Sequence, residues 1–518
     1  MLKSRFALKK GQPGYAVIVV LSILLCQTAF AQGFTPNVRV NDVTSDFQAP
    51  EGGRAVATLG DTVYVVWSDA RAYNDDIYFA RSTDGGLTFG TSVSVSSVDT
   101  LAEEIPSITV DASGIIYVTW LSIDSSFSHW WTYFAKSTDG GASFTTGVMV
   151  DSMAVGASIA VYGNNVYILY GQIVGQSAVD CYFARSTDGG VNFGTPYKVN
   201  NAPPQDTLQI MDGDITYTDL SVDASGNIYA VWADGRRNGG NQDIYFAKST
   251  DNGVSFGTNV PVNDTTGTVG DSMQISPSIA VSGSNVYVVW LDYRSGERRI
   301  YSAKSTDGGA TFGANTPVND TTLEVDCWRP SIATSASGLI YVAYSANKTG
   351  TGQGIWCTES DDSGATFYSS VAVSDAFDDS ARCPSITVDA NNVANVVWSD
   401  ERTGSKDVYF AKGTVTGIED SDSDSSPITL ELIENNPFTG SVSIRYILTR
   451  SAHIELAIYN IEGQLIKKLS SGEEMPGAHI VTWNRKDEMN RNVRSGIYFC
   501  QLRETGGIRK VRKILLLR

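Results

Sequence analysis

The 518-residue sequence has little of what metal-dependent, disulfide-rich or membrane-spanning proteins require. It contains three His and six Cys with no CxxC spacing, which excludes zinc-ribbon and thiol-redox motifs. Only His129 lies in the body of the chain, so a His-rich zinc site there is excluded. No apolar run reaches the roughly 18 residues that a membrane-spanning helix needs.

Turn-forming and β-forming residues are abundant instead. The chain has 49 Gly, 24 Tyr, 19 Phe and 10 Trp, and 42% of its residues are hydrophobic. This composition predicts a large β-rich core and excludes wholesale disorder. The formal net charge is −18, and most of the acidic residues lie in residues 32–426. An acidic body repels phosphate backbones, so we expect no nucleic-acid partner.

Residues 1–31 have the pattern of a signal peptide. A basic segment, Lys3–Lys10, precedes the apolar run Ala16–Leu25, and Ala29–Ala31 supplies the small residues that a signal peptidase requires. The pattern predicts cleavage before Gln32. We therefore expect a secreted or cell-surface protein, exported across the inner and outer membranes.

One unit of about four short β-patterned runs repeats through residues 32–412, which we take as one domain. Near-continuous apolar runs predict strands that are buried on both faces, as in sheets stacked radially around an axis. We expect a seven-bladed β-propeller, with six or eight blades as the alternatives. The second strand of the unit recurs as Val63–Trp67, Ile116–Trp120, Val166–Tyr170, Ile228–Trp232, Val286–Trp290, Ile340–Tyr344 and Asn395–Trp398.

The two ends of the repeat array complement each other. The seventh unit stops after Val408–Lys412 without a fourth strand, whereas Pro36–Asp42 matches the fourth-strand segments Asn259–Asp264 and Thr316–Asp320. We expect this N-terminal segment to complete the last blade, which removes an open sheet edge.

Six units carry the motif Ser-x-Asp-x-Gly-x-(Thr/Ser/Asn)-Phe, which begins at Ser82, Ser137, Ser186, Ser249, Ser305 and Ser360. The motif resembles the Asp box (BNR repeat) of sialidase-like propellers over about residues 34–412. Its Asp can accept backbone hydrogen bonds within the turn, its Gly allows positive φ, and its Phe can fill the gap between blades. We expect a structural role for Asp84, Asp139, Asp188, Asp251, Asp307 and Asp362. No cofactor is expected, and a structural calcium ion at these Asp residues is the alternative role.

A sialidase resemblance implies an Arg triad, a Tyr/Glu nucleophile pair and an Asp acid/base. The Arg-Ile-Pro signature of that family is absent, because Arg54 is followed by Ala55 and Val56. Tyr344 aligns with the Trp of other units, which indicates a core aromatic residue. No catalytic residue is therefore carried over from the family. The sequence favours a non-enzymatic function over that of a sialidase-like glycoside hydrolase.

Five Arg residues are candidates for ligand binding on one face. Arg54, Arg329 and Arg382 precede the first strands of units one, six and seven, which are neighbours in a closed ring. Arg71 and Arg402 follow second strands that return to the same face. Guanidinium groups suit a carboxylate or sulfate, and Trp328 could stack on a sugar ring. The alternative is structural: Asp-x-Arg recurs in four units, as expected of a copied ion pair.

The repeated sequence pattern ends at residue 412. Residues 413–427 are acidic and Ser-rich and form an expected linker, and residues 428–518 read as a small Ig-like β-sandwich. This domain resembles the C-terminal sorting domain of the type IX secretion system, with the Ig-like domain of flagellar hook caps as the nearest similar pattern. The resemblance implies the secretion machinery as a partner. It rests on Asn436–Phe438, Ala457–Asn460, Gly477–Trp483, Ser495–Tyr498 and Arg509–Arg518.

The sequence as a whole predicts an exported, non-catalytic propeller, monomeric, that binds a glycan or protein ligand. A sialidase-type exo-glycosidase acting on the upper face and a structural or adhesive repeat protein are the alternatives. Cys327 and Cys383 precede the first strands of adjacent units, so we also consider a disulfide between them.

Overall fold

The structure is a computed structural model. It describes residues 33–43, 48–50, 54–71, 74–96, 100–174, 178–201, 218–238, 241–264, 273–321, 323–377, 381–414, 428–432, 440–460, 465–504 and 509–516. Every regular element in these ranges is a β-strand, which confirms the all-β prediction. The predicted signal peptide and most of the predicted linker lie outside the described residues. No helix in the described part of the chain could span a membrane.

The described strands between residues 33 and 414 form seven small antiparallel sheets, which we number in chain order. Sheet 1 contains β3 (Gln48–Ala49), β4 (Val56–Leu59), β5 (Thr62–Asp69), β6 (Asp76–Ser82) and β7 (Val93–Ser94); sheet 2 contains β8 (Ala102–Val110), β9 (Ile116–Ile123), β10 (Trp130–Ser137) and β11 (Val148–Ser152). Sheet 3 contains β12 (Ala154–Tyr162), β13 (Asn165–Val174), β14 (Ala178–Ser186) and β15 (Tyr197–Lys198); sheet 4 contains β16 (Thr218–Val222), β17 (Ile228–Asn238), β18 (Asn241–Ser249) and β19 (Val260–Pro261). Sheet 5 contains β20 (Gln274–Ser282), β21 (Asn285–Asp292), β22 (Arg299–Ser305) and β23 (Thr316–Pro317); sheet 6 contains β24 (Glu324–Thr334), β25 (Ile340–Lys348), β26 (Gly352–Ser360) and β27 (Val371–Ala372). Sheet 7 contains β28 (Arg382–Val388), β29 (Ala394–Asp400) and β30 (Asp407–Thr414), together with β1 (Gly33–Phe34) and β2 (Val38–Arg39).

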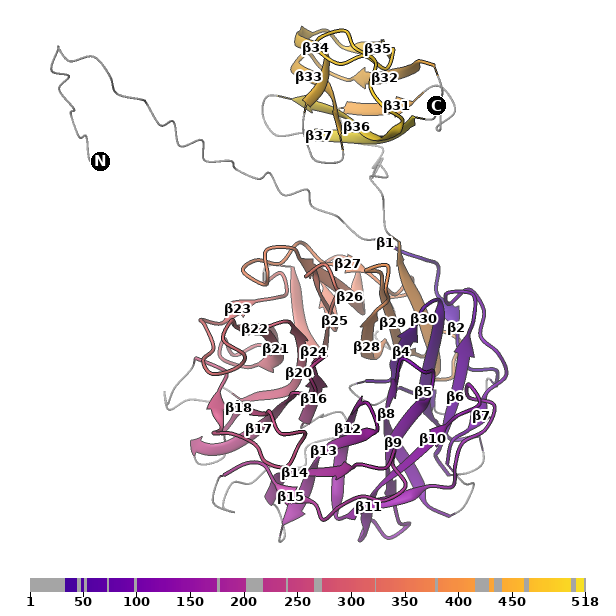
Figure 1. The fold of residues 1–518 in the computed structure, drawn as a ribbon, viewed down its shortest axis with the longest axis vertical. Helices are drawn as coiled ribbons and strands as arrows, with labels where there is room; N and C mark the ends of the chain where they lie inside the picture. Colours follow the sequence, from indigo (N-terminus) through magenta and orange to yellow (C-terminus); the bar gives the residue numbers. More distant parts are fainter. Residues whose placement is uncertain are drawn as a thin grey trace, which may run out of the picture.

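The seven sheets stand around a common centre, as expected of a β-propeller (Figure 1). Strands β4, β8, β12, β16, β20, β24 and β28 contact one another in that order, and β28 contacts β4 again. Each sheet therefore packs between two neighbours. This explains why the second strands are buried on both faces and why Trp67, Trp232 and Trp290 are almost fully buried.

A repeated Ser on the first strands links consecutive sheets. The Oγ of Ser278 accepts a hydrogen bond from the Ile332 N–H (3.4 Å), and that of Ser331 accepts one from the Ile386 N–H (3.2 Å). The Oγ of Ser385 in sheet 7 accepts one from the Ala55 N–H of sheet 1 (2.9 Å). The Pro-Ser-Ile repeat in the sequence thus specifies hydrogen bonds between the sheets on either side of it.

The N-terminal segment completes sheet 7, which confirms the expected closure. Strand β2 pairs with β30, with Val38 opposite Phe410. The buried Asn41 side chain accepts a hydrogen bond from the Val408 N–H (2.9 Å) and donates one to the Asp407 carboxylate (2.7 Å). Phe34 packs against the apolar cluster between sheets 6 and 7. The first and last strands of the ring are therefore joined by contacts between distant parts of the chain.

A second unit follows from residue 428. One sheet contains β31 (Ile428–Leu432), β32 (Val442–Leu448) and β35 (Gly477–Trp483); the other contains β33 (Ala452–Asn460), β34 (Leu465–Glu474), β36 (Gly496–Glu504) and β37 (Arg509–Leu516). The two sheets share an apolar core of their own that includes Tyr446, Ile458 and Trp483. The unit is therefore a two-sheet β-structure with its own core.

No disulfide joins the five cysteines of the described chain, so the disulfide considered between Cys327 and Cys383 is wrong. Each of the two thiols is instead held separately in the packing at the start of its own sheet.

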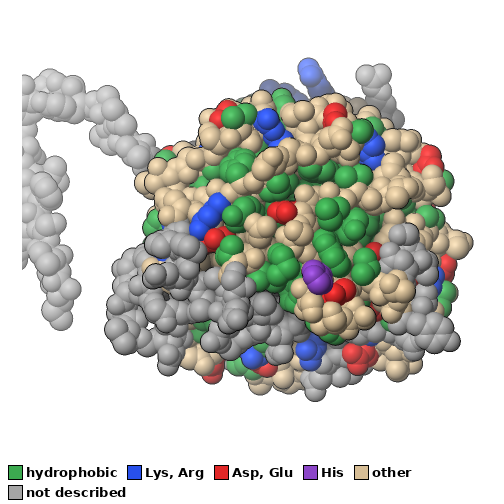
Figure 2. Space-filling model, turned by 90° about the horizontal axis from the view of Figure 1, so that it is seen from below, with side chains coloured by type: hydrophobic (Ala, Val, Ile, Leu, Met, Phe, Trp, Pro, Cys, Tyr) green, Lys and Arg blue, Asp and Glu red, His purple; other side chains and the backbone are tan. Residues whose placement is uncertain are grey.

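A space-filling view of one face shows broad patches of hydrophobic side chains, with Lys, Arg, Asp and Glu scattered between them (Figure 2).

Candidate ligand-binding site

The Asp boxes form the turns between third and fourth strands, and their Ser and Asp side chains form hydrogen bonds within the turn. In the first box, the Ser82 hydroxyl donates to Asp84 (2.6 Å) and accepts the Gly86 N–H (2.8 Å). The backbone and hydroxyl of Thr88 donate to the two oxygens of Asp84. These hydrogen bonds, first that from Ser82, hold the pKa of Asp84 well below its usual value. The carboxylate is therefore committed to the turn.

Each Asp box also contacts the sheet before it. In five of the six boxes the Phe packs edge-on against a third-strand Phe of the sheet before it in the ring, as Phe144 does against Phe79 with ring centroids 5.2 Å apart. The box of sheet 6 differs, because sheet 5 has Ser302 at that position. The second Gly of the box lies on the same ring, because a Cβ on Gly141 (φ +89°) would come within 2.2 Å of Phe79. The boxes thus join neighbouring sheets. This contact explains why Gly and Phe recur at fixed positions of the motif.

Basic residues at the ends of third strands reach the next Asp box. Arg81, Lys136 and Arg185 donate to backbone carbonyls of the boxes in sheets 2, 3 and 4. In sheet 6 the same position is Glu359, which faces sheet 7, where the sequence has no Asp box. Glu359 is 6% exposed, and its Oε1 has no hydrogen-bond partner among the described residues. Burial, with a contribution from the charge of Asp361, raises the pKa of Glu359 to about 7.

The arginines of the Asp-x-Arg repeats connect neighbouring sheets through polar contacts. Arg71 pairs with the buried Asp69 and with Asp42 of the closing N-terminal segment, and it stacks on Tyr78 at 4.0 Å. Arg402 pairs in the same way with Asp400 and with Asp375, which follows β27 of sheet 6. Arg236 and Arg294 repeat the pairing with Asp234 and Asp292. Arg71 and Arg402 therefore have buried carboxylate partners in the fold itself.

Arg54 is directed toward the far side of the ring. Its Nε lies 2.7 Å from the carboxylate of Asp219 in sheet 4, and a terminal nitrogen donates to the Ile279 carbonyl of sheet 5. Asp219 also accepts hydrogen bonds from Ser158 and Ser278. Because Asp219 is almost fully buried, this ion pair ties sheets 1, 3, 4 and 5 together. Arg54 does not join the other two residues of the predicted trio.

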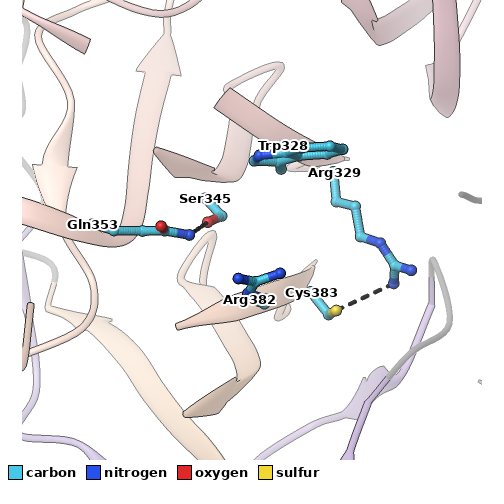
Figure 3. A pocket seen from close by; sticks show the side chains of 6 residues that line it. All are labelled: Trp328, Arg329, Ser345, Gln353, Arg382 and Cys383. Atoms are coloured by element: carbon cyan, nitrogen blue, oxygen red, sulfur yellow. Dashed lines mark hydrogen bonds between the residues drawn. The ribbon is translucent and has the colours of Figure 1, made fainter. Parts of the chain in front are cut away.

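Arg329 and Arg382 do lie together, with Trp328, around a small pocket that encloses about 20 Å³ and opens to solvent. The pocket is formed by the irregular middle of β24, by the start of β28 and by facing residues of β25 and β26. Its lining residues are Trp328, Arg329, Ser345, Gln353, Arg382 and Cys383. Figure 3 shows Trp328 and Arg382 on opposite sides of the space, with Gln353 and Ser345 at one end and Arg329 with Cys383 at the other.

The two guanidinium groups of the pocket differ in burial. Arg329 is 7% exposed and donates to the sulfur of Cys383 at 3.2 Å, whereas Arg382 is exposed. Arg298 lies over the Trp328 ring at 3.5 Å from its centroid, which leaves a single ring face for a ligand. Gln353 donates to Ser345 at 3.3 Å. The pocket thus combines positive charge, an aromatic face and neutral polar groups.

Sequence reasoning missed three of the lining residues, Ser345, Gln353 and Cys383. Cys383 has a signal that could have found it: it stands before Pro-Ser-Ile in unit seven, where unit six has Arg329. Both residues have positive φ (+57° and +42°) at the bulge of a first strand. Ser345 and Gln353 follow no repeated pattern, and only the pairing of β25 with β26 brings them to the pocket.

Tyr344 lies in the core. It is fully buried, and its hydroxyl donates to Glu324, also fully buried, at 2.7 Å. Burial raises the pKa of Tyr344 well above its usual value. Lys348 completes the group by pairing with Glu324. Among the described residues, no cluster of three or more His, Cys, Asp or Glu side chains could hold a metal ion.

No known protein-family model matches the chain, and no curated protein matches it. Several solved structures are similar at low sequence identity. A protein of unknown function from Dyadobacter fermentans is 13% identical, with a TM-score of 0.47, covering 74% of this chain and 98% of that one. The GH93 α-L-arabinofuranosidase of Fusarium graminearum is 12% identical (TM-score 0.47; 73% and 97% covered). The intramolecular trans-sialidase from Ruminococcus gnavus is 13% identical (TM-score 0.36; 74% and 94% covered).

Proposed function

We propose that this chain is an exported, seven-bladed propeller that binds a glycan through a carboxylate or sulfate group in the pocket of sheets 6 and 7. The observation that carries the proposal is the convergence of Arg329, Arg382 and Trp328 on one pocket. Two guanidinium groups in an otherwise acidic protein favour an anion, and their planar forks suit the oxygens of a carboxylate or sulfate.

The size of the pocket defines how a glycan binds. The enclosed part of the pocket measures about 20 Å³, room for little more than one water-sized group, so only the charged substituent of a glycan enters it and the sugar ring stays at its mouth. In this binding mode the acidic group enters between Arg329 and Arg382. The sugar ring then lies against the free face of Trp328, and Gln353 supplies a neutral hydrogen-bonding group.

Two observations support binding rather than hydrolysis. Arg54, the residue nearest to a family arginine, is held by Asp219, and Tyr344 with its Glu324 partner is fully buried. A nucleophile must be within reach of its substrate, so this buried Tyr/Glu pair does not meet the geometry that catalysis demands.

The proposal includes the route of export. Residues 1–31 serve as the signal peptide and residues 428–518 as the sorting domain read by the secretion machinery. The separate apolar core of the C-terminal unit supports its role as an independent module. A fusion of residues 428–518 to a reporter protein tests this part: the reporter should reach the medium of a type IX-competent host, and retention in the periplasm would contradict it.

The binding experiment uses the mature chain and a panel of uronate-bearing and sulfated oligosaccharides, with neutral oligosaccharides of the same backbone. We expect binding of at least one acidic glycan, weakened by added salt, and no detectable release of sugar. Arg382→Ala should weaken binding about tenfold, since a charge-assisted hydrogen bond contributes about 1.5 kcal/mol at an exposed residue. Arg39→Ala is the matched control, because Arg39 is exposed on β2 of the same sheet and does not line the pocket.

Four outcomes would contradict the proposal. Equal affinity for neutral and acidic glycans would remove the role of the arginine pair. Unchanged binding by Arg382→Ala would place the ligand elsewhere. Release of a monosaccharide would show the exo-glycosidase, and absence of binding to the whole panel would favour the structural or adhesive alternative.

A further inference from the structure

Four of the five described cysteines lie in apolar cores. Cys500, Cys327, Cys181 and Cys357 each belong to a hydrophobic cluster and are at most 3% exposed. Burial raises the pKa of each of these four thiols, which keeps them protonated. A protonated thiol in an apolar core is chemically inert.

Cys383 has a different environment. It lines the pocket that Arg329 and Arg382 also line, and the Arg329 guanidinium donates to its sulfur at 3.2 Å. Although the residue as a whole is 3% exposed, its sulfur lies at the end of the pocket next to Arg329 (Figure 3). A positive charge beside a sulfur favours the thiolate, which is the nucleophilic form of cysteine.

We propose that Cys383 is a reactive thiol that forms a mixed disulfide with small disulfides carrying carboxylates, which the arginine pair draws into the pocket. The proposal rests on the anion-binding pocket of the proposed function. It adds a covalent modification site within that pocket. Acidic peptide disulfides of the glutathione type are the chemical class that combines both requirements.

The reaction is a thiol–disulfide exchange. The Cys383 thiolate attacks one sulfur of the incoming disulfide, so a new bond forms between Cys383 and that sulfur while the original sulfur–sulfur bond breaks. The other half leaves as a thiolate and takes up the proton that Cys383 released. The incoming disulfide is the oxidant, and no further reactant is needed.

The experiment compares two aliphatic disulfides of opposite charge at pH 8, 3,3′-dithiodipropionate and cystamine, on the native, full chain. Each rate of adduct formation is divided by the rate for free N-acetylcysteine, which removes intrinsic differences between the reagents. Peptide mass spectrometry identifies the modified residue and counts Cys26, outside the described residues, separately. We expect the adduct at Cys383 and not at the four buried thiols, and an anionic-to-cationic rate ratio above about 10.

Variants separate the pocket from general reactivity. Cys383→Ser should abolish the adduct at this site. Arg382→Ala should lower the anionic-to-cationic ratio at least threefold, and its exposed position makes folding failure a minor concern. Arg39→Ala removes the same charge from the same sheet and should leave the ratio unchanged. Added salt should reduce the ratio in the wild-type chain.

Modification of a buried thiol in preference to Cys383, an unmodified Cys383 in the native chain, or equal normalised rates for the two reagents would overturn the proposal. Its failure is distinguishable from that of the proposed function. Arg382-dependent glycan binding with an unreactive Cys383 removes only the thiol proposal. A reactive Cys383 with anionic preference, but no acidic glycan bound, removes only the glycan.

Discussion

Replacing an Asp-box glycine tests whether these boxes join neighbouring sheets. The change is Gly141→Ala in the box of sheet 2. A Cβ there would lie 2.2 Å from the Cε1 of Phe79, which is 1% exposed on sheet 1, and the backbone has φ +89°. A left-handed conformation costs alanine about 1–2 kcal/mol. Displacing a packed ring costs about 1–3 kcal/mol more. We therefore expect a loss of about 2–5 kcal/mol in the free energy of unfolding.

Gly163→Ala is the matched control. Gly163 also has positive φ (+57°), but no atom of the described residues lies within 4 Å of its Cβ position, so this change carries only the backbone cost of about 1–2 kcal/mol. Thermal unfolding followed by tryptophan fluorescence is a suitable assay, because Trp120 of sheet 2 is almost fully buried. Gly141→Ala should lower the melting temperature about twice as much as the control.

A double variant isolates the contact itself. Phe79→Ala alone leaves a cavity, but in the presence of Gly141→Ala the new methyl group no longer meets the ring. The two changes should therefore be non-additive by about 1–3 kcal/mol, with the double variant more stable than the sum of the two single effects predicts. Additive effects, or equal losses for Gly141→Ala and Gly163→Ala, would refute the role of the box in joining sheets 1 and 2.

Two further predictions concern sheet 7 and its border with sheet 6. Deleting residues 33–43 removes β1 and β2 and exposes the edge of β30, so the variant should associate and melt at a lower temperature; an unchanged melting curve and a monomeric elution volume would contradict the closure. The pKa of Glu359 is raised to about 7 by burial and by Asp361, above its usual 4.5. A raised carboxyl pKa means that the folded state binds the proton more tightly, so this stabilising contribution is present below pH 4.5 and is lost as pH rises through 7. Glu359→Gln should therefore be more stable than the wild type at pH 8 and differ less at pH 5.5, and parallel melting profiles across this range would exclude the effect.

The sequence predicted those features that depend on local pattern. Strands, Asp boxes and the closing segment could be located because each copy carries its own periodicity, turn residues and length. Arg329 and Arg382 could be placed near each other because they stand at adjacent positions of consecutive units. Where the same position recurs in neighbouring sheets, the fold itself turns sequence spacing into proximity.

The partners of the same residues could not be predicted, because they come from distant units. Asp219 replaces a Ser of the repeat in unit four, and only the closed ring brings its carboxylate to Arg54. In unit six, the carboxylate that pairs with Lys348 comes from Glu324 on the first strand, since Ala346 stands where four other units have Asp. Ion pairs across a ring depend on the closure of the ring and on side-chain rotamers. The spacing of residues within a unit predicts neither.

The joining of the two chain ends in sheet 7 sets an order of events during synthesis. Asn41 and Val408, which share a hydrogen bond, are separated by 367 residues. At about 5–20 residues per second, Asn41 emerges about 20–75 seconds before its partner. The segment around Asn41 therefore has no sheet to join until nearly the whole array has been made. A chain truncated at any earlier unit has nothing to pair with it, so ring closure reports that every unit is present.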